Sequence, residues 1–317
     1  MRRRDILAGA MASTLAACSA QRSGREPAPE LRVAVQKGGA RALFAASGLL
    51  AGAPYHVAWS EFGAASPLLE ALSDGAVDLG GVGDAPFVFA FAAGAPIRAV
   101  QAYRSGGVPG SSVAVLTARG SSIREVAGLR GRSVATTRGS VGHYLLIRLI
   151  DRAGLPASSV RTVFLDPAAA RAALTSGSVD AWATWAPYVG FGVLHDGDRV
   201  LADGQGLMSG IGFTVANQGS LASKLALIDD FLARQARAYE WARAHPQELA
   251  AAISRDTGLP DDVARDMVAR GRAQVIPIDQ ALVAEERMTF DAFRRAGVIE
   301  RQIDVADAFA PDRTRSA

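Results

Sequence analysis

Residues 133–146 combine a glycine corner with side chains that could hold an anion. A β-branched run beginning at Val134 predicts a strand, and Arg138-Gly139-Ser140 forms a corner before apolar residues with helical spacing. Ser140 stands where an N-cap belongs. A helix start offers free backbone N–H groups and the positive end of the helix dipole, which suits an anion. The same pattern also fits an ordinary capped corner, so the residues alone leave both interpretations open.

The elements that would position this corner occur twice, with a spacing of 101 to 102 residues. Residues 33–38 match 134–139, since each segment runs from a strand through a cation to a glycine. Residues 72–78 match 174–180, and each half then places a proline at a predicted helix start. Two similar lobes with a cleft between them would explain the repeat, and convergence of common βαβ corners is the alternative.

Strands and helices are predicted to alternate, which favours an α/β fold with helices on both faces of a sheet. Strands are expected near residues 31–35, 56–59, 77–84, 97–103, 113–116, 134–137, 160–165, 179–185 and 207–215. Helices are expected near residues 40–50, 66–72, 87–93, 123–129, 145–150 and 168–175, and from residue 221 onward, including 261–272 and 279–296.

The N-terminus has the pattern of an export signal. Three arginines precede a short apolar run in residues 1–17, and Arg3-Arg4 resembles a twin-arginine signal. Leu15-Ala16-Ala17-Cys18 resembles a lipobox, which predicts lipidation of Cys18, and a cleavable signal with a chance cysteine is the alternative. Residues 18–30 read as a flexible tether. The predicted location is therefore the periplasm, with a lipid anchor.

Composition narrows the class of function. The 34 basic and 31 acidic residues nearly balance, and the leader carries three of the arginines, so no nucleic-acid surface is indicated. We find no metalloprotease, serine-hydrolase or phosphate-loop motif, and the single cysteine lies in the leader. Asp78 and Asp180 occupy matching places in the repeat, and a structural role at the strand is expected rather than a catalytic pair. Neither enzyme activity nor a cofactor is predicted.

Several segments together resemble the periplasmic aliphatic sulfonate-binding proteins of ABC importers, in the wider taurine, nitrate and pyrimidine-precursor binding group. The segments that carry the resemblance are 35–39, 59–62, 69–86, 139–146, 179–188 and 201–204. The resemblance implies a type II periplasmic binding fold, with residues 31–110 plus 209–317 as lobe 1, residues 111–208 as lobe 2 and the ligand between them. It also implies an organic sulfonate ligand, a membrane permease as partner and a monomeric protein.

This sequence departs from the family pattern at three places. Arg138 stands where family members often have a lysine, and Ala186 stands where an acid often follows the second tryptophan. Asp166-Pro167-Ala168-Ala169 begins a helix whose start is usually proline-rich with an aspartate inside. These changes affect which ligand tail the site would prefer. Taurine, nitrate, another small anion or a pyrimidine precursor is therefore the alternative ligand, and a ligand-sensing lobe pair is an alternative function.

The resemblance also implies which residues hold the sulfonate. Backbone N–H groups are expected from Gly38 and Gly39 in lobe 1 and from Gly139, Ser140 and Val141 in lobe 2, with the Ser140 hydroxyl as an added donor. The other expected ligand-binding residues are Gln36, Lys37, Asp84, Ala85, Arg138, His143, Trp185 and Met208.

Several of these residues have competing roles. Lys37 could reach the anion or steer it from the rim, and Arg138 could contact it or form a salt bridge. His143 lies at a helix start, which disfavours its charged form and makes it a neutral donor. The Asp84 carboxylate would repel a sulfonate, so it is expected to cap a helix or to meet an amino group on the ligand, while the Ala85 N–H contacts the ligand. Trp185 is expected to face the ligand's tail.

Overall fold

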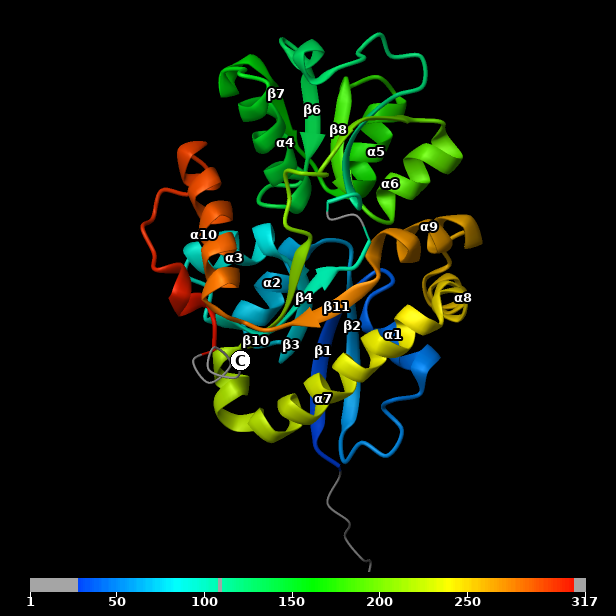
Figure 1. Ribbon diagram of the computed structural model, residues 1–317, viewed down its shortest axis with the longest axis vertical. Helices are drawn as coiled ribbons and strands as arrows, with labels where there is room; N and C mark the ends of the chain where they lie inside the picture. Colours follow the sequence, from blue (N-terminus) through cyan, green and yellow to red (C-terminus); the bar gives the residue numbers. More distant parts are fainter. Residues whose placement is uncertain (1–27, 108–109, 311–317) are drawn as a thin grey trace, which may run out of the picture.

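Strand-forming segments that alternate with helices build two separate sheets. The computed structural model describes residues 28–107 and 110–310 and places each sheet in its own lobe (Figure 1). The sheet of lobe 1 has the strand order β11-β4-β10-β3-β1-β2. Its strands are β1 (Glu30–Gln36), β2 (His56–Phe62), β3 (Leu79–Gly83), β4 (Ile97–Ser105), β10 (Ile211–Asn217) and β11 (Ala273–Ile276).

The sheet of lobe 2 has the order β7-β6-β8-β5-β9. Its strands are β5 (Val113–Thr117), β6 (Ser133–Thr136), β7 (Arg161–Phe164), β8 (Ala181–Trp185) and β9 (Arg199–Asp203). The helices of lobe 2 are α4 (Val141–Arg152), α5 (Pro167–Thr175) and α6 (Tyr188–Phe191). The helices of lobe 1 are α1 (Ala40–Ser47), α2 (Ala65–Ser73), α3 (Asp84–Ala92), α7 (Gln218–Ala244), α8 (Pro246–Thr257), α9 (Asp261–Gly271) and α10 (Gln280–Arg295).

Alternating side chains of β1 divide lobe 1 into two packed layers. Val33 and Val35 share a core with Phe44 of α1 and Phe231 of α7. Ala34 points to the opposite face and belongs to the core that contains Leu68 of α2. Helices therefore cover both faces of the sheet, as the strand–helix alternation predicted.

Helix α10 belongs to lobe 1 but also contacts lobe 2. The ring of Phe293 lies 6.0 Å from that of Phe89 on α3 and 5.5 Å from that of Tyr144 on α4. In Figure 1 the helix runs alongside both of these elements. This contact gives the two lobes a shared apolar seam on one side of the molecule.

The sequence repeat corresponds to repeated geometry. Val33 pairs with Leu79 in the parallel β1–β3 ladder, and Val134 pairs with Ala181 in the parallel β6–β8 ladder. The aspartate before each second strand closes the unit in the same way: Asp78 accepts the N–H of Arg32, and Asp180 accepts the N–H of Ser133, both at 2.8 Å. Both aspartates have the structural role that the sequence predicted.

Two segments connect the lobes, one after β4 and one before β10. They run side by side, since the Gly204 N–H donates to the Gly110 carbonyl at 3.2 Å. Gly110 has a φ of +83°, and an added Cβ would overlap the carbonyl of Gly204. A glycine is therefore required where the two crossovers touch.

Some elements differ from the prediction. Strands β9 and β11 were not expected as strands, because each is a short segment whose pairing depends on a distant partner. The helix expected at residues 123–129 forms only a 3₁₀ turn at Val126–Leu129. The strand expected at residues 207–215 begins at Ile211.

Candidate functional site

The carboxyl ends of four parallel strands meet at the boundary between the lobes. Strands β1 and β3 are parallel in lobe 1, and β6 and β8 are parallel in lobe 2. Helices α1, α3 and α4 begin directly after β1, β3 and β6. Ligands of α/β folds bind at this edge of the sheet, because the helix N-termini gather there.

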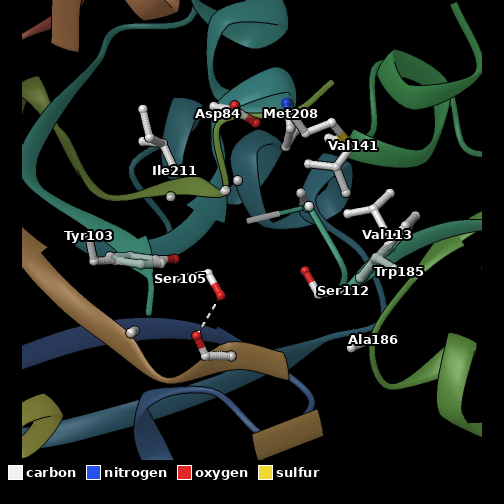
Figure 2. Close-up of a pocket in the computed structure, with 18 of the residues that line it drawn as sticks. Asp84, Tyr103, Ser105, Ser112, Val113, Val141, Trp185, Ala186, Met208 and Ile211 are labelled. Carbon is white, nitrogen blue, oxygen red and sulfur yellow. Dashed lines mark hydrogen bonds between the residues drawn. The ribbon is translucent and has the colours of Figure 1, made fainter. Parts of the chain in front are cut away.

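A cavity of about 230 Å³ lies at this boundary and is lined by both lobes. Figure 2 shows Tyr103 and Ile211 on one side of it, with Val113 and Trp185 on the other. Its lining includes Gln36, Asp84, Ser105, Ser112, Ser140, Val141 and Met208. A second cavity of about 190 Å³ adjoins it and contains Lys37 and Gly39. The structure thus brings Gln36, Lys37, Gly39, Asp84, Ser140, Val141, Trp185 and Met208 together along one cleft.

Ser140 is the N-cap of α4, as predicted. Its hydroxyl oxygen accepts the N–H of His143 at 3.1 Å, and the side chain lines the cavity. The Ser140 N–H donates to the Thr137 carbonyl, so this predicted donor is already occupied. Among the described residues, no hydrogen bond engages the N–H groups of Val141 or Gly142. The Val141 N–H, one of the predicted donors, is therefore free, and so is the Gly142 N–H, which was not predicted.

The corresponding corner in lobe 1 is also partly occupied. The Gly39 N–H donates to the Gln36 carbonyl at 2.9 Å, which closes the turn before α1. Gly38 has a φ of +73°, lies against Met267 of α9 and lines neither cavity. Gln36 lines both cavities and donates its amide to the Gly81 carbonyl at 3.3 Å. The side chains of Gln36 and Lys37 therefore supply polar groups to the cavities from this corner, while the Gly39 N–H is already used within the turn.

Asp84 is buried at the wall of the cavity. It is the first residue of α3 while Gly83 is the N-cap, which corrects its predicted place as the capping residue. Its carboxylate accepts the Ala85 N–H at 2.7 Å and the Ser209 hydroxyl at 2.7 Å. Burial raises the pKa of Asp84, and the hydrogen bonds from Ser209 and Ala85 oppose that shift. Ala85 is fully buried and its N–H is taken, so the predicted Ala85 contact with a ligand is not available in this structure.

Three residues predicted to bind the ligand, Arg138, Gly139 and His143, contact other parts of the protein instead. The guanidinium of Arg138 stacks over the Phe164 ring at 3.9 Å. The Gly139 N–H donates to Nδ1 of His143 at 3.2 Å, and His143 is buried. Burial, and next the positive charge of Arg138, lower the pKa of His143 to about 4. His143 is therefore neutral, as predicted, and it stabilises the corner by accepting the Gly139 N–H. Among the described residues that line the two cavities, none of these three is found.

Trp182 and Trp185 face opposite sides of β8, as their spacing predicted. Trp182 is 1% exposed within the core of lobe 2, whereas Trp185 lines both cavities. Met208 lies on the return crossover and lines the first cavity. These two side chains give the cleft an apolar wall in lobe 2.

Sequence reasoning missed several lining residues, chief among them Tyr103, Ser105 and Ser112. Tyr103 lies on β4 directly against Gly212 of β10, where an added Cβ would overlap the ring. The glycine-rich run before β10 was the available signal, but it did not reveal which side chain fills the space. Burial, and next the negative Asp84, raise the pKa of Tyr103 to about 12, so its hydroxyl remains a donor.

Within residues 28–107 and 110–310, we find no group of three or more His, Cys, Asp or Glu side chains that could hold a metal ion. No helix in the same ranges is long and apolar enough to cross a bilayer. Cys18 lies outside the described residues.

Two α/β lobes joined by two crossovers, with a cavity between their helix N-termini, define a periplasmic solute-binding protein fold. The model of the NMT1/THI5-like family matches residues 57–249, more than half of the chain. The chain belongs to this family, together with the aliphatic sulfonate-binding proteins.

The relatives are consistent with that placement. A protein of Escherichia coli K12 named as an aliphatic sulfonates-binding protein is 33% identical over 306 residues, covering 95% of each chain. The alkanesulfonate-binding protein SsuA of Xanthomonas axonopodis pv. citri, solved with bound MOPS, is 32% identical with a TM-score of 0.82, covering 90% of this chain and 99% of that one.

The periplasmic aliphatic sulphonate-binding protein SsuA of Escherichia coli is 32% identical with a TM-score of 0.78, covering 91% of this chain and 94% of that one. All three relatives are binding proteins. They confirm the predicted fold and the prediction that this chain is a binding protein and not an enzyme.

Proposed function

We propose that this protein captures an organic sulfonate anion outside the cytoplasm and delivers it to an ABC importer. The observation that carries the proposal is the N-terminus of α4, which opens into a cavity shared by both lobes. The Val141 N–H, the Ser140 hydroxyl and the Gln36 amide supply neutral donors there, with Lys37 in the adjoining cavity. A sulfonate keeps its charge near neutral pH, so a site of this kind can hold it without a buried counter-charge.

The tail of the ligand would lie against the apolar wall. Trp185, Met208, Val113 and Ile211 all line the first cavity, next to the helix start. An alkyl or aryl group in this place would gain about 25 cal/mol for each Å² of apolar surface that it buries. The same wall disfavours nitrate, which has no apolar part to bury.

Calorimetry with C2 to C8 alkanesulfonates, taurine, nitrate and sulfate tests the ligand class. We expect the alkanesulfonates to bind and nitrate and sulfate to give no heat. Binding of nitrate or sulfate in the absence of sulfonate binding would refute the assignment.

Ser140→Asp and Ser140→Asn form a matched pair that tests the site. Both replacements are good N-caps, so α4 is retained in each. The aspartate adds a negative charge beside the bound anion, and we expect it to abolish sulfonate binding, whereas the asparagine variant keeps it. Thermal unfolding checks the fold of both variants, and equal binding by the two would remove α4 from the site.

We further propose that residues 31–110 plus 209–317 and residues 111–208 are units that close on the ligand. Contacts between the units support this: the Tyr188 hydroxyl donates to the Gly63 carbonyl at 3.0 Å, and His195 lies 3.1 Å from Asp262. The paired crossovers provide a short hinge. Small-angle scattering should show a smaller radius of gyration with ethanesulfonate, and an unchanged radius would contradict closure.

The export signal in residues 1–17 and a lipid on Cys18 belong to the same proposal, together with a monomeric protein and a tether. The predicted tether of residues 18–30 is shortened at its end, because Glu30 already belongs to β1. The arginine-rich start and the Leu15-Ala16-Ala17-Cys18 sequence support it. Cys18→Ser should release the protein from the membrane fraction into the soluble periplasm. Retention of that variant on membranes would argue against lipidation.

A further inference from the structure

The cleft continues into a second chamber, the second cavity described above, which reaches into lobe 1 and is bordered by Trp185 to Tyr188 of lobe 2. Gln36, Tyr103, Trp185 and Ala186 line both the first cavity and this chamber, so they form the passage between them. Beyond the passage, the chamber is bounded by strands β3 and β10 and by α7. Its walls there include Gly80, Gly81, Thr214, Phe231, Gln235 and Tyr239.

A glycine keeps this chamber open. Gly81 on β3 lies directly opposite Thr214 on β10, so the two residues share the face of the sheet that α7 covers. A Cβ built at Gly81 would meet only the Tyr103 hydroxyl, at 3.9 Å. An added methyl group would therefore fit the fold and project into the chamber.

The chamber presents hydrogen-bond donors that the protein does not use. Gln235 is 3% exposed, and its Oε1 accepts the Thr214 hydroxyl at 2.8 Å. No hydrogen bond from its Nε2, or from the Tyr239 hydroxyl, is found within the described residues. Because this amide faces the chamber and has no acceptor in the part of the protein that the structure describes, it is available to an acceptor on a ligand. Lys37, which lines the same chamber, adds a cationic donor.

We propose that this chamber is the subsite for the distal end of the ligand, and that it selects sulfonates whose tail ends in a hydroxyl or ether oxygen. The inference rests on the proposed function, in which the sulfonate lies at the start of α4. From there the tail passes Tyr103 and Trp185, and its terminal oxygen accepts the Gln235 amide. A plain hydrocarbon tail of equal length leaves that amide unpaired, and sites built to pair a polar group reject analogues that lack it.

Matched ligand pairs test the selectivity. Each ω-hydroxyalkanesulfonate from C3 to C6 is compared with the n-alkanesulfonate that has the same number of heavy atoms, with ethanesulfonate as a ligand too short for the chamber. In calorimetry we expect at least one hydroxylated ligand to bind about tenfold more tightly than its hydrocarbon partner. Equal affinities in every pair, with ethanesulfonate bound, would overturn the subsite and leave the proposed function standing.

Two variants test the residues. Gln235→Met keeps the side-chain length and removes the donor, together with the oxygen that accepts the Thr214 hydroxyl. It should abolish the preference while ethanesulfonate affinity stays within about twofold. Gly81→Ala places a methyl group in the chamber and narrows it, so it should weaken only the longer ligands. Thermal unfolding verifies that each variant is folded, and either variant carries the test if the other is unstable.

The outcomes separate the two proposals. Equal losses for ethanesulfonate and the hydroxylated ligands would overturn the role of Gln235 in selectivity. Failure of every sulfonate to bind the unmodified protein would instead overturn the proposed function, and the subsite with it.

Discussion

Asp78 offers the sharpest test of how the repeat stabilises the fold. Its side chain is 0% exposed and lies between β1 and α7. The carboxylate accepts hydrogen bonds from the Arg32 N–H at 2.8 Å, the Arg32 guanidinium at 2.7 Å, the Ser220 hydroxyl at 2.7 Å and the Lys224 ammonium at 2.7 Å. Asp78→Asn keeps the size of the side chain and removes the charge that pairs with two cations.

The repeat supplies a matched control in lobe 2. Asp180 accepts the Ser133 N–H and hydroxyl at 2.8 Å, but its side chain is 32% exposed and its ion pair with Arg132 spans 3.3 Å. An asparagine there can still accept the backbone N–H. We therefore expect Asp180→Asn to lower the free energy of unfolding by about 1 kcal/mol or less.

The expected loss for Asp78→Asn is larger, because a buried charge network loses its central member. Breaking a buried pair costs about 3–5 kcal/mol. The side chains of Arg32 and Lys224 are 36% and 28% exposed and can partly rehydrate, so we expect a value near the lower end of that range.

Urea unfolding followed by tryptophan fluorescence at several pH values measures both losses. Burial alone would raise the pKa of Asp78, but hydrogen bonds from Arg32, Lys224 and Ser220 outweigh it and hold the pKa below its usual value. The stabilisation is therefore complete above the unfolded pKa of about 3.9 and declines as the pH falls below it. The difference between wild type and Asp78→Asn should be constant from pH 5 to 8 and shrink at lower pH. A loss no larger than that of Asp180→Asn would refute the reasoning.

Three further variants test the site. The pKa of His143 is lowered to about 4, so this side chain stays neutral in the folded protein, whereas in the unfolded chain it takes up a proton near pH 6.5. The free energy of unfolding of wild type therefore declines as the pH falls from 6.5 towards 4. His143→Asn should lack that part of the decline when its free energy of unfolding is compared with that of wild type at about pH 7 and about pH 4.5. Gly212→Ala should push the Tyr103 ring into the cavity and weaken ethanesulfonate binding at least about tenfold in calorimetry, and an unchanged affinity would place the ligand elsewhere. Trp185→Phe should remove the fluorescence change on ligand binding, which would persist if the buried Trp182 were the reporter.

Local patterns in the sequence were enough to predict most of the fold. The alternation at β1, the cap at Ser140 and the repeated segments around Asp78 and Asp180 are encoded over a few neighbouring residues, so they could be read without tertiary contacts. Strands β9 and β11 could not, because their pairing partners β5 and β4 lie far away in the chain.

The sequence predicted which helix start borders the site, but it predicted less well which N–H groups are free to bind a ligand. Ser140 and Val141 of the predicted corner do line the cavity. Which N–H groups remain free depends on turns that close within the corner, since Gly139 donates to His143 and Ser140 donates to Thr137. These competing acceptors come from side-chain packing and turn geometry, which the residue types do not specify.

The sequence by itself determined the two-lobed α/β plan and the helix start at Ser140, because hydrophobic periodicity, glycine corners and caps are local properties. Only the tertiary structure decided what surrounds the ligand. Tyr103 reaches the cavity because Gly212 on the neighbouring strand leaves room for its ring, and the chamber behind it exists because Gly81 faces α7 without a side chain. Such space depends on which distant residues pack against each other, and no local pattern records it.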